Sequence, residues 1–151
     1  LKENNIRLKI IGDLPRLSPN VQKQIEKAEE ATAGCNAFQL TVCLSYGARQ
    51  EMVHAIRAIA EDVAAGKIKP DAIDEAMLEA KLYTQDLPAP DLLIRTGGEH
   101  RLSNFLLWQS AYTELYFTDT LWPDFSRADL ELAMSEYARR ERRFGGLRTG
   151  K

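Results

Sequence analysis

The sequence has few cysteines, no long apolar run and no excess of charge of one sign. Its two cysteines, Cys35 and Cys43, have no metal-ligand spacing and are too few for a disulfide scaffold, so we expect reduced thiols in a cytoplasmic protein. No segment approaches the ~18 consecutive apolar residues of a transmembrane helix. A formal net charge of −2 argues against a general nucleic-acid-binding protein.

The length and composition are sufficient for one domain. With 151 residues and 44% hydrophobic content, the chain can build a hydrophobic core, and we expect a single domain over residues 1–151. The chain begins with Leu1, and its first five residues resemble the end of a helix. We therefore expect this sequence to be the C-terminal portion of a longer domain.

Segments of strand pattern alternate with segments of helical pattern. Runs rich in β-branched and aromatic residues predict strands over residues 6–12, 37–45, 91–95 and 113–118. Apolar residues at helical spacing, together with capping residues, predict helices. These cover residues 18–34, 49–65, 70–81 (one or two short helices), 103–111 and a last helix from Ser126.

Three of the expected helices carry an apolar stripe that we expect to face a sheet. The stripes are Val21, Ile25, Ala28 and Ala31 in the first helix, Met52, Val53, Ile56, Ile59, Ala60 and Val63 in the second, and Leu130, Ala133, Met134 and Tyr137 in the last. The alternation predicts an α/β protein with a mostly parallel β-sheet flanked by helices on both faces. Ligands of such sheets bind outside the carboxyl ends of the strands.

Residues 91–103 combine a strand end, two glycines and several cationic or polar side chains. Gly97 and Gly98 allow the chain to turn sharply after the strand. Arg95 and Arg101 can then direct guanidinium groups toward one anion, and a guanidinium can bond two phosphate oxygens at once. The segment therefore predicts a phosphate or diphosphate site, with a solvated polar turn as the alternative.

Residues 91–125 resemble the signature region of the cis-prenyltransferases, and most closely that of bacterial-type undecaprenyl diphosphate synthases. The resemblance continues more weakly before residue 90. The positions that match the signature are Asp91, Arg95, Thr96, Gly98, Glu99, Arg101, Ser103, Phe105, Trp108, Tyr112, Glu114, Phe117, Trp122, Pro123 and Phe125.

The resemblance implies a transferase that condenses isopentenyl diphosphate with an allylic diphosphate such as farnesyl diphosphate. The product would be a long-chain polyprenyl diphosphate such as undecaprenyl diphosphate, with cis double bonds. Arg95, Arg101 and Ser103 are implied to bind the diphosphate of isopentenyl diphosphate. Glu114 is implied to help hold Mg²⁺, which prefers carboxylate and phosphate oxygens, and an exposed strand carboxylate is the alternative.

Further roles depend on the same resemblance. His100 is implied to be catalytic, assisting the handling of a proton or of diphosphate, and an exposed loop histidine is the alternative. Arg143 and Gly145 match an Arg-x-Gly motif that is implied to contact diphosphate across a homodimer. The alternative for these last cations is an interaction with the helix dipole. His54 lies on the flank of a helix, and we expect it to be solvated.

Several aromatic residues of the signature are expected in the core or in the homodimer interface, since aromatic side chains dominate both. A peripheral association with membranes is expected because the product is a long lipid. Phe38 begins a strand whose inward residues are implied to line the product tunnel. Ser45 and Ala48 replace residues that are common in the family, and we expect their turn to be retained.

The sequence lacks the Asp-Gly-Asn-x-Arg-Trp and Phe-Ser-x-Glu-Asn-Trp motifs of full-length family members. The first motif would supply a catalytic aspartate and contacts to the allylic diphosphate. We therefore expect these 151 residues alone to be inactive. The alternative function is a non-catalytic partner subunit of a heteromeric cis-prenyltransferase, which the retained arginines argue against.

Overall fold

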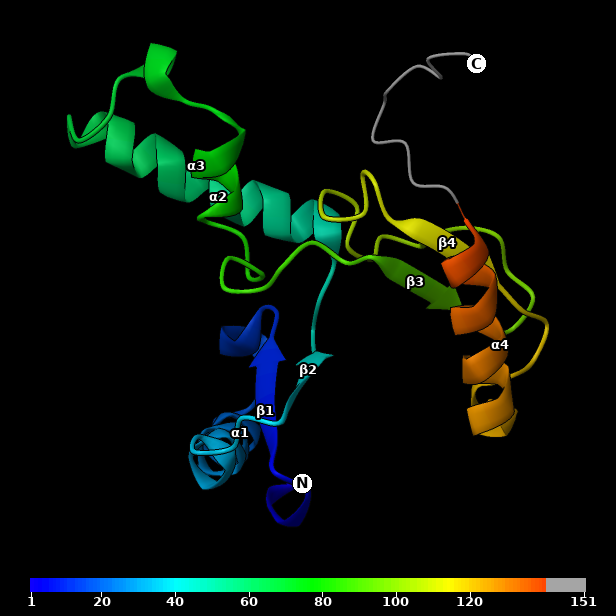
Figure 1. Cartoon of the computed structure of the whole chain (residues 1–151). Helices are drawn as coiled ribbons and strands as arrows, with labels where there is room; N and C mark the ends of the chain where they lie inside the picture. The colour runs from blue at the N-terminus through cyan, green and yellow to red at the C-terminus, as the bar shows by residue number, and fades with distance from the viewer. Residues whose placement is uncertain (141–151) are drawn as a thin grey trace, which may run out of the picture. The chain divides into compact units, whose positions relative to one another are not determined.

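The computed structural model describes residues 1–140. It divides into two compact units, Leu1–Leu87 and a second unit that begins at Pro88 (Figure 1). Each unit contains two parallel strands and at least one helix, which confirms the expected α/β class with parallel pairing. Within residues 1–140, no helix is both long and apolar enough to cross a membrane.

The first unit contains two strands and three α-helices. In chain order they are β1 (Ile6–Ile11), α1 (Pro19–Thr32), β2 (Phe38–Cys43), α2 (Ala48–Ala64) and α3 (Glu75–Glu79). Strands β1 and β2 pair in parallel, with register from Ile6 opposite Phe38 to Ile11 opposite Cys43. The expected strands at 6–12 and 37–45 and the expected helices at 18–34 and 49–65 are therefore confirmed to within a few residues.

Helix α1 covers the outer edge of β1 (Figure 1). Thr32 Oγ1 accepts a hydrogen bond from the backbone N–H of Leu8 at 3.0 Å, and Glu29 Oε1 accepts one from that of Ile10 at 2.7 Å. These side chains satisfy donors that would otherwise be open to another strand. Among residues 1–140, β1 is therefore an edge strand whose outer side is covered by α1. The predicted inner face of α1 is wrong for Val21 and Ala31, which are exposed.

Helix α2 has a different inner face from the predicted stripe. Its buried residues are Ala48, Glu51, Ala55 and Ile59. The two alanines permit close approach of the backbone, and Glu51 makes hydrogen bonds at this face. Of the predicted stripe only Ile59 is buried, and Val53 and Ile56 are largely exposed. The prediction followed the bulky residues, whereas the buried row of the helix consists of two alanines, a glutamate and one isoleucine.

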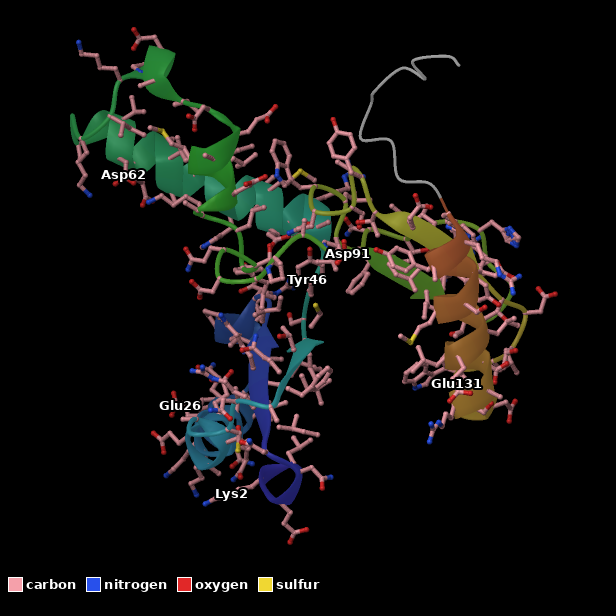
Figure 2. The ribbon with its side chains drawn as sticks, viewed as in Figure 1. Lys2, Glu26, Tyr46, Asp62, Asp91 and Glu131 are labelled. Atoms are coloured by element: carbon pink, nitrogen blue, oxygen red, sulfur yellow. The ribbon has the colours of Figure 1, made fainter. Side chains whose placement is uncertain are left out.

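The end of α2 is joined to the segment after α3 by one carboxylate. Asp62, labelled in Figure 2, accepts hydrogen bonds from Lys67 Nζ at 2.8 Å and from Lys81 Nζ at 2.7 Å. These two ammonium groups lower the pKa of Asp62 from 3.8 to about 2. The segment between Lys67 and Lys81 contains the short 3₁₀ helix Pro70–Ala72 and helix α3. The expectation of one or two short helices over residues 70–81 is therefore confirmed.

The second unit contains β3 (Leu92–Arg95), β4 (Glu114–Phe117) and α4 (Arg127–Arg139). Strands β3 and β4 pair in parallel, with Leu92 opposite Glu114 and Arg95 opposite Phe117. Among the described strands, the two pairs form separate two-stranded sheets.

The expected helix over residues 103–111 is wrong. This segment is a series of turns, in which Ser103, Asn104 and Leu106 have φ values of 48°, 63° and 43°. Residues with positive φ cannot continue a right-handed helix. Helical periodicity in the sequence does not report such local reversals.

Helix α4 begins with the expected cap. Ser126 Oγ accepts a hydrogen bond from the Asp129 backbone N–H, and the Asp129 carboxylate accepts one from the Ser126 backbone N–H at 2.8 Å. The Asp129 carboxylate also accepts a hydrogen bond from the Ser126 hydroxyl, and this bond, followed by the one from the Ser126 N–H, lowers the pKa of Asp129. The predicted inner face is correct for Ala133, which is buried, and wrong for Leu130 and Met134, which are exposed.

Candidate functional site

The loop after β3 turns at two glycines with positive φ. Gly97 and Gly98 have φ values of 86° and 73°, where a side chain would be strained. Their N–H groups donate to the carbonyl oxygens of Thr120 and Thr118 at 2.9 and 3.0 Å. These bonds fasten the loop to the chain that leaves β4, so the residues that follow β3 have a defined position at the carboxyl ends of both strands.

Two arginines of this loop meet at a single carboxylate. Glu99 Oε2 accepts a hydrogen bond from Arg95 Nη2, and Glu99 Oε1 accepts one from Arg101 Nη2. The structure thus brings together the two cations that the sequence assigns to a diphosphate. The bridging role of Glu99 was not predicted, although its position four residues after Arg95 and two before Arg101 is consistent with such a bridge.

Arg95 is partly enclosed, whereas Arg101 is accessible. The side chain of Arg95 is 31% exposed and that of Arg101 is 67% exposed. The buried Nε of Arg95 has no hydrogen-bond partner among residues 1–140. A buried donor of a charged group is costly to leave unpaired. Arg95 is therefore held in place and retains an Nε donor without a partner among residues 1–140, whereas the guanidinium of Arg101 is open to solvent.

His100 and Ser103 lie in the same loop. The His100 imidazole stacks on the ring of Phe117, with ring centroids 5.0 Å apart and planes 9° from parallel. This contact places His100 beside the carboxyl end of β4, near the level of Arg95. Ser103 is exposed, and its φ of 48° marks a turn two residues after Arg101. The roles predicted for these two side chains stay predictions.

Glu114 is not part of this cluster. It is the first residue of β4, whereas Phe117, which pairs with Arg95, is the last. Three residues of strand at ~3.3 Å each put the Cα of Glu114 about 10 Å from the carboxyl end of β4. The metal role predicted for Glu114 would therefore act at a distance from the arginine pair within one chain.

A cation of the same chain already contacts Glu114. Arg140 Nη1 donates to Glu114 Oε2 at 2.9 Å and to the carbonyl oxygen of Leu115 at 2.8 Å. These bonds fasten the end of α4 to the beginning of β4. No local pattern predicts this pair, because 26 residues separate its members. Arg143 and Gly145, predicted to contact diphosphate, lie outside the described residues.

The carboxyl ends of β1 and β2 form a second tightly packed edge. Gly12 has a φ of 133°, and a Cβ at this position would lie 2.0 Å from the carbonyl oxygen of Leu44. The next residue, Asp13, donates its backbone N–H to the carbonyl oxygen of Ser45 at 3.2 Å. The turns that leave the two strands are therefore in direct contact. This edge is where parallel sheets place their ligands.

A buried carboxylate joins this edge to the helices. Glu51 on α2 is 1% exposed. Its Oε2 accepts a hydrogen bond from the Tyr46 hydroxyl at 2.6 Å, and its Oε1 accepts one from the Tyr83 backbone N–H at 2.8 Å. Burial, together with the negative charges of Asp13 and Glu51, raises the pKa of the Tyr83 phenol. This cluster was not predicted, because its members come from segments up to 32 residues apart.

His54 is exposed, as expected, and its ring stacks on that of Tyr83 with centroids 5.4 Å apart. Burial, with a further contribution from the Glu51 charge, raises the pKa of the Cys43 thiol. Cys43 remains a free thiol, as expected, and so does Cys35.

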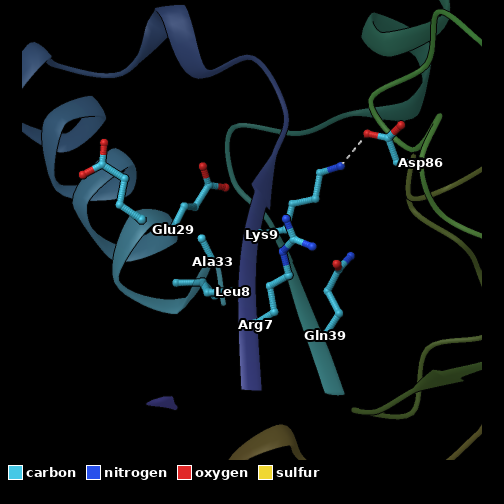
Figure 3. Close-up of a pocket in the computed structure, with 8 residues that line it drawn as sticks. Arg7, Leu8, Lys9, Glu29, Ala33, Gln39 and Asp86 are labelled. Atoms are coloured by element: carbon cyan, nitrogen blue, oxygen red, sulfur yellow. Dashed lines mark hydrogen bonds and ion pairs between the residues drawn. The ribbon is translucent and has the colours of Figure 1, made fainter. Parts of the chain in front are cut away.

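A groove of about 510 Å³ in the first unit is lined by none of the predicted site residues (Figure 3). Arg7, Lys9 and Gln39 line it from the sheet, and Glu29 lines it from α1. Lys9 Nζ forms an ion pair with Asp86 at 2.9 Å across the groove. Because cations and carboxylates are interspersed there, the groove has no excess charge that would favour an anionic ligand.

Solved structures of two diphosphate synthases resemble this chain. Lavandulyl diphosphate synthase from Lavandula x intermedia, in complex with dimethylallyl diphosphate, has a TM-score of 0.89 and 45% identity, over 93% of this chain and 60% of that one. A probable undecaprenyl diphosphate synthase from Campylobacter jejuni has a TM-score of 0.82 and 40% identity, over 96% of this chain and 65% of that one.

Curated relatives include ditrans,polycis-undecaprenyl-diphosphate synthases specific for (2E,6E)-farnesyl diphosphate. The protein of Escherichia coli K12 is 51% identical over 150 residues, which are 99% of this chain and 59% of that protein. The protein of Xanthomonas axonopodis pv. citri is 50% identical over 145 residues, 96% of this chain and 56% of that protein. The chain therefore spans somewhat more than half the length of these relatives. The family model for undecaprenyl diphosphate synthase matches residues 1–145, and the chain belongs to that family.

Proposed function

We propose that this chain is part of a cis-prenyltransferase that condenses isopentenyl diphosphate with an allylic diphosphate. The observation that carries the proposal is the meeting of Arg95 and Arg101 in a loop fixed by glycines at the carboxyl end of β3. Two guanidinium groups can neutralise much of the charge of a diphosphate and fix its orientation. The (2E,6E)-farnesyl-diphosphate specificity in the names of the curated relatives supports farnesyl diphosphate as the allylic substrate.

The loop would contribute mainly by orientation. When the loop holds the diphosphate of isopentenyl diphosphate, the double bond of this substrate is positioned to attack the allylic carbon. The reaction then takes place between bound, oriented groups instead of after a bimolecular encounter. Ser103 would add a hydroxyl donor, and His100, held by its stacking on Phe117, would assist the handling of the proton or of the diphosphate. Arg143 and Gly145 would contact diphosphate across a homodimer.

The growing chain needs an apolar surface, and β2 offers one. Phe38, Leu40 and Val42 alternate along the strand and therefore share one face of it. Their side chains are 62%, 38% and 38% exposed. Polyprenyl chains would bury this surface at a gain of roughly 25 cal/mol per Å². The size of Phe38 would then limit product length.

Mg²⁺ is the cofactor that this function requires. Among residues 1–140 there is no group of three His, Cys, Asp or Glu side chains that could hold a metal. Mg²⁺ commonly uses one or two carboxylates and takes its remaining ligands from phosphates and water, so Glu114, 28% exposed, fits as one ligand. When bound, the ion would neutralise charge on the departing diphosphate. Arg140 would then share or release the Glu114 carboxylate.

Assembly as a homodimer is part of the proposal. Tyr112, Leu121 and Trp122 are 70%, 60% and 75% exposed, although they are large and apolar. Exposed apolar patches mark interaction sites, and tyrosine and tryptophan are enriched in protein interfaces. A cytoplasmic location with peripheral contact to membranes is also proposed, since a long polyprenyl product partitions into lipid.

The test is an assay of labelled isopentenyl diphosphate incorporation by the whole protein that carries this chain. With farnesyl diphosphate and Mg²⁺, we expect a polyprenyl diphosphate product that is absent when Mg²⁺ is chelated. Incorporation without Mg²⁺, or no incorporation by a folded protein with any allylic diphosphate, would contradict the proposal.

A further inference from the structure

Glu51 is the one charged side chain that is buried among residues 1–140. Placing a carboxylate in the interior costs free energy unless hydrogen bonds compensate it. An apolar residue here would continue the buried row of α2 at lower cost. The carboxylate therefore requires an explanation beyond packing.

The two oxygens of Glu51 connect three segments of the first unit. Oε2 accepts from the hydroxyl of Tyr46, which lies between β2 and α2 (Figure 2). Oε1 accepts from the backbone N–H of Tyr83, which follows α3. The two tyrosine rings also meet edge to face, with centroids 6.4 Å apart. The carboxylate thus holds the chain that leaves β2 against the chain that follows α3.

The chain that leaves β2 is held in an unfavourable conformation. Ser45 has a φ of 52°, which costs free energy for a residue with a side chain. Such a conformation persists only where the surroundings impose it. From the sheet, the Asp13 N–H donates a hydrogen bond to the Ser45 carbonyl oxygen. From the helix, the Glu51 carboxylate accepts one from the Tyr46 hydroxyl. The turn is therefore fixed from both the sheet and the helix.

We propose that Glu51 is a positioning residue, whose carboxylate fixes the turn of residues 45–49 at the carboxyl end of β2 for the binding of a diphosphate substrate. The turn lies where parallel sheets bind ligands, and it carries the cation Arg49 at the start of α2. The substrate class rests on the proposed function. A purely structural role predicts lower stability of the fold without a specific effect on substrate affinity.

Two variants test the hydrogen bond between Glu51 and Tyr46, one at each residue. Glu51→Gln keeps the shape of the side chain but places an amide where the carboxylate accepts hydrogen bonds. Tyr46→Phe removes only the hydroxyl and leaves the ring contact with Tyr83. Glu61→Gln, an exposed position of the same helix, is the matched control.

The first measurement is amide hydrogen exchange of residues 45–49 in the whole protein. We expect exchange at least about tenfold faster in Glu51→Gln and in Tyr46→Phe than in the wild type and in Glu61→Gln. Unchanged exchange in both test variants would overturn the positioning role, whether or not the protein is active.

The second measurement is steady-state incorporation of isopentenyl diphosphate. We expect the KM of at least one diphosphate substrate to rise roughly fivefold or more in both variants, with a smaller change in kcat. Equal KM values despite faster exchange would overturn the functional part of the inference. An inactive wild type would instead contradict the proposed function, and the exchange data would still decide the role of Glu51.

Discussion

The bridging carboxylate of Glu99 provides a sharp test of the diphosphate site. Its two oxygens engage Arg95 and Arg101, so the cations that would bind the ligand are already paired. A diphosphate must displace this carboxylate or bind beside its negative charge. Glu99→Gln keeps the side-chain shape and removes the charge. We therefore expect the variant to bind inorganic diphosphate more tightly than the wild type.

The exposure of the side chains sets the size of this effect. Glu99 is 39% exposed, and its partners are 31% and 67% exposed. Ion pairs this accessible are worth about 0.2–1 kcal/mol each. Two pairs therefore oppose ligand binding by ~0.4–2 kcal/mol, which corresponds to a dissociation constant lowered about 2- to 30-fold.

Isothermal titration of the whole protein with inorganic diphosphate at fixed ionic strength measures this change. Glu131→Gln is the matched control, since Glu131 forms a comparable exposed pair with Arg127 at 2.7 Å on α4. The control should bind as the wild type does. Weaker binding by Glu99→Gln would refute the reasoning and would mean that Glu99 aligns the arginines rather than competing with the ligand.

Three further predictions concern other parts of the structure. Ser126→Ala removes the cap of α4 and should lower the free energy of unfolding by about 1 kcal/mol in a denaturant titration, whereas an unchanged midpoint would argue against the capping box. Asp62 should titrate near pH 2 in a carboxyl NMR experiment. Because its folded pKa lies below the usual 3.8, its stabilising contribution is present above pH 3.8 and is lost as the pH falls through about 2; a titration near pH 4 would disprove the pairing. Glu51→Gln should lower the pKa of the Cys43 thiol and speed its alkylation at pH 8, and an unchanged rate would show that burial alone controls this thiol.

The strands could be predicted because their sequence signals are local, and their parallel pairing because strands and helices alternate along the chain. Runs of β-forming residues defined β1, β2, β3 and β4 to within a few positions. The cap at Ser126 and the turn at Gly97 and Gly98 were equally local, since each depends on residue types with strong backbone preferences. The turn that brings Arg95 and Arg101 together could be predicted for the same reason.

Packing could not be predicted from bulk and periodicity. On α2 the larger residues Val53 and Ile56 remain exposed, and the helix packs along the row of Ala48, Glu51 and Ala55. A glutamate within a buried row is a weak signal, because most glutamates are exposed. Only its partners, which come from segments up to 32 residues away, explain its burial.

Long-range ion pairs were missed for a related reason. Arg140, directly after α4, meets Glu114 at the start of β4, and no local pattern predicts a contact between residues 26 positions apart. The resemblance implied a metal role for Glu114 without its position, and the structure places it about 10 Å along β4 from the end that pairs with Arg95.

The most direct test of the central claim compares Arg101→Gln with Arg127→Gln in the whole protein. Arg127 is an exposed arginine on α4, outside the loop. We measure the KM for isopentenyl diphosphate at a fixed, saturating concentration of farnesyl diphosphate. Loss of one charge-assisted contact of ~1.5 kcal/mol should raise the KM of Arg101→Gln about tenfold and leave that of Arg127→Gln at the wild-type value. An unchanged KM in Arg101→Gln would contradict a diphosphate site at this loop.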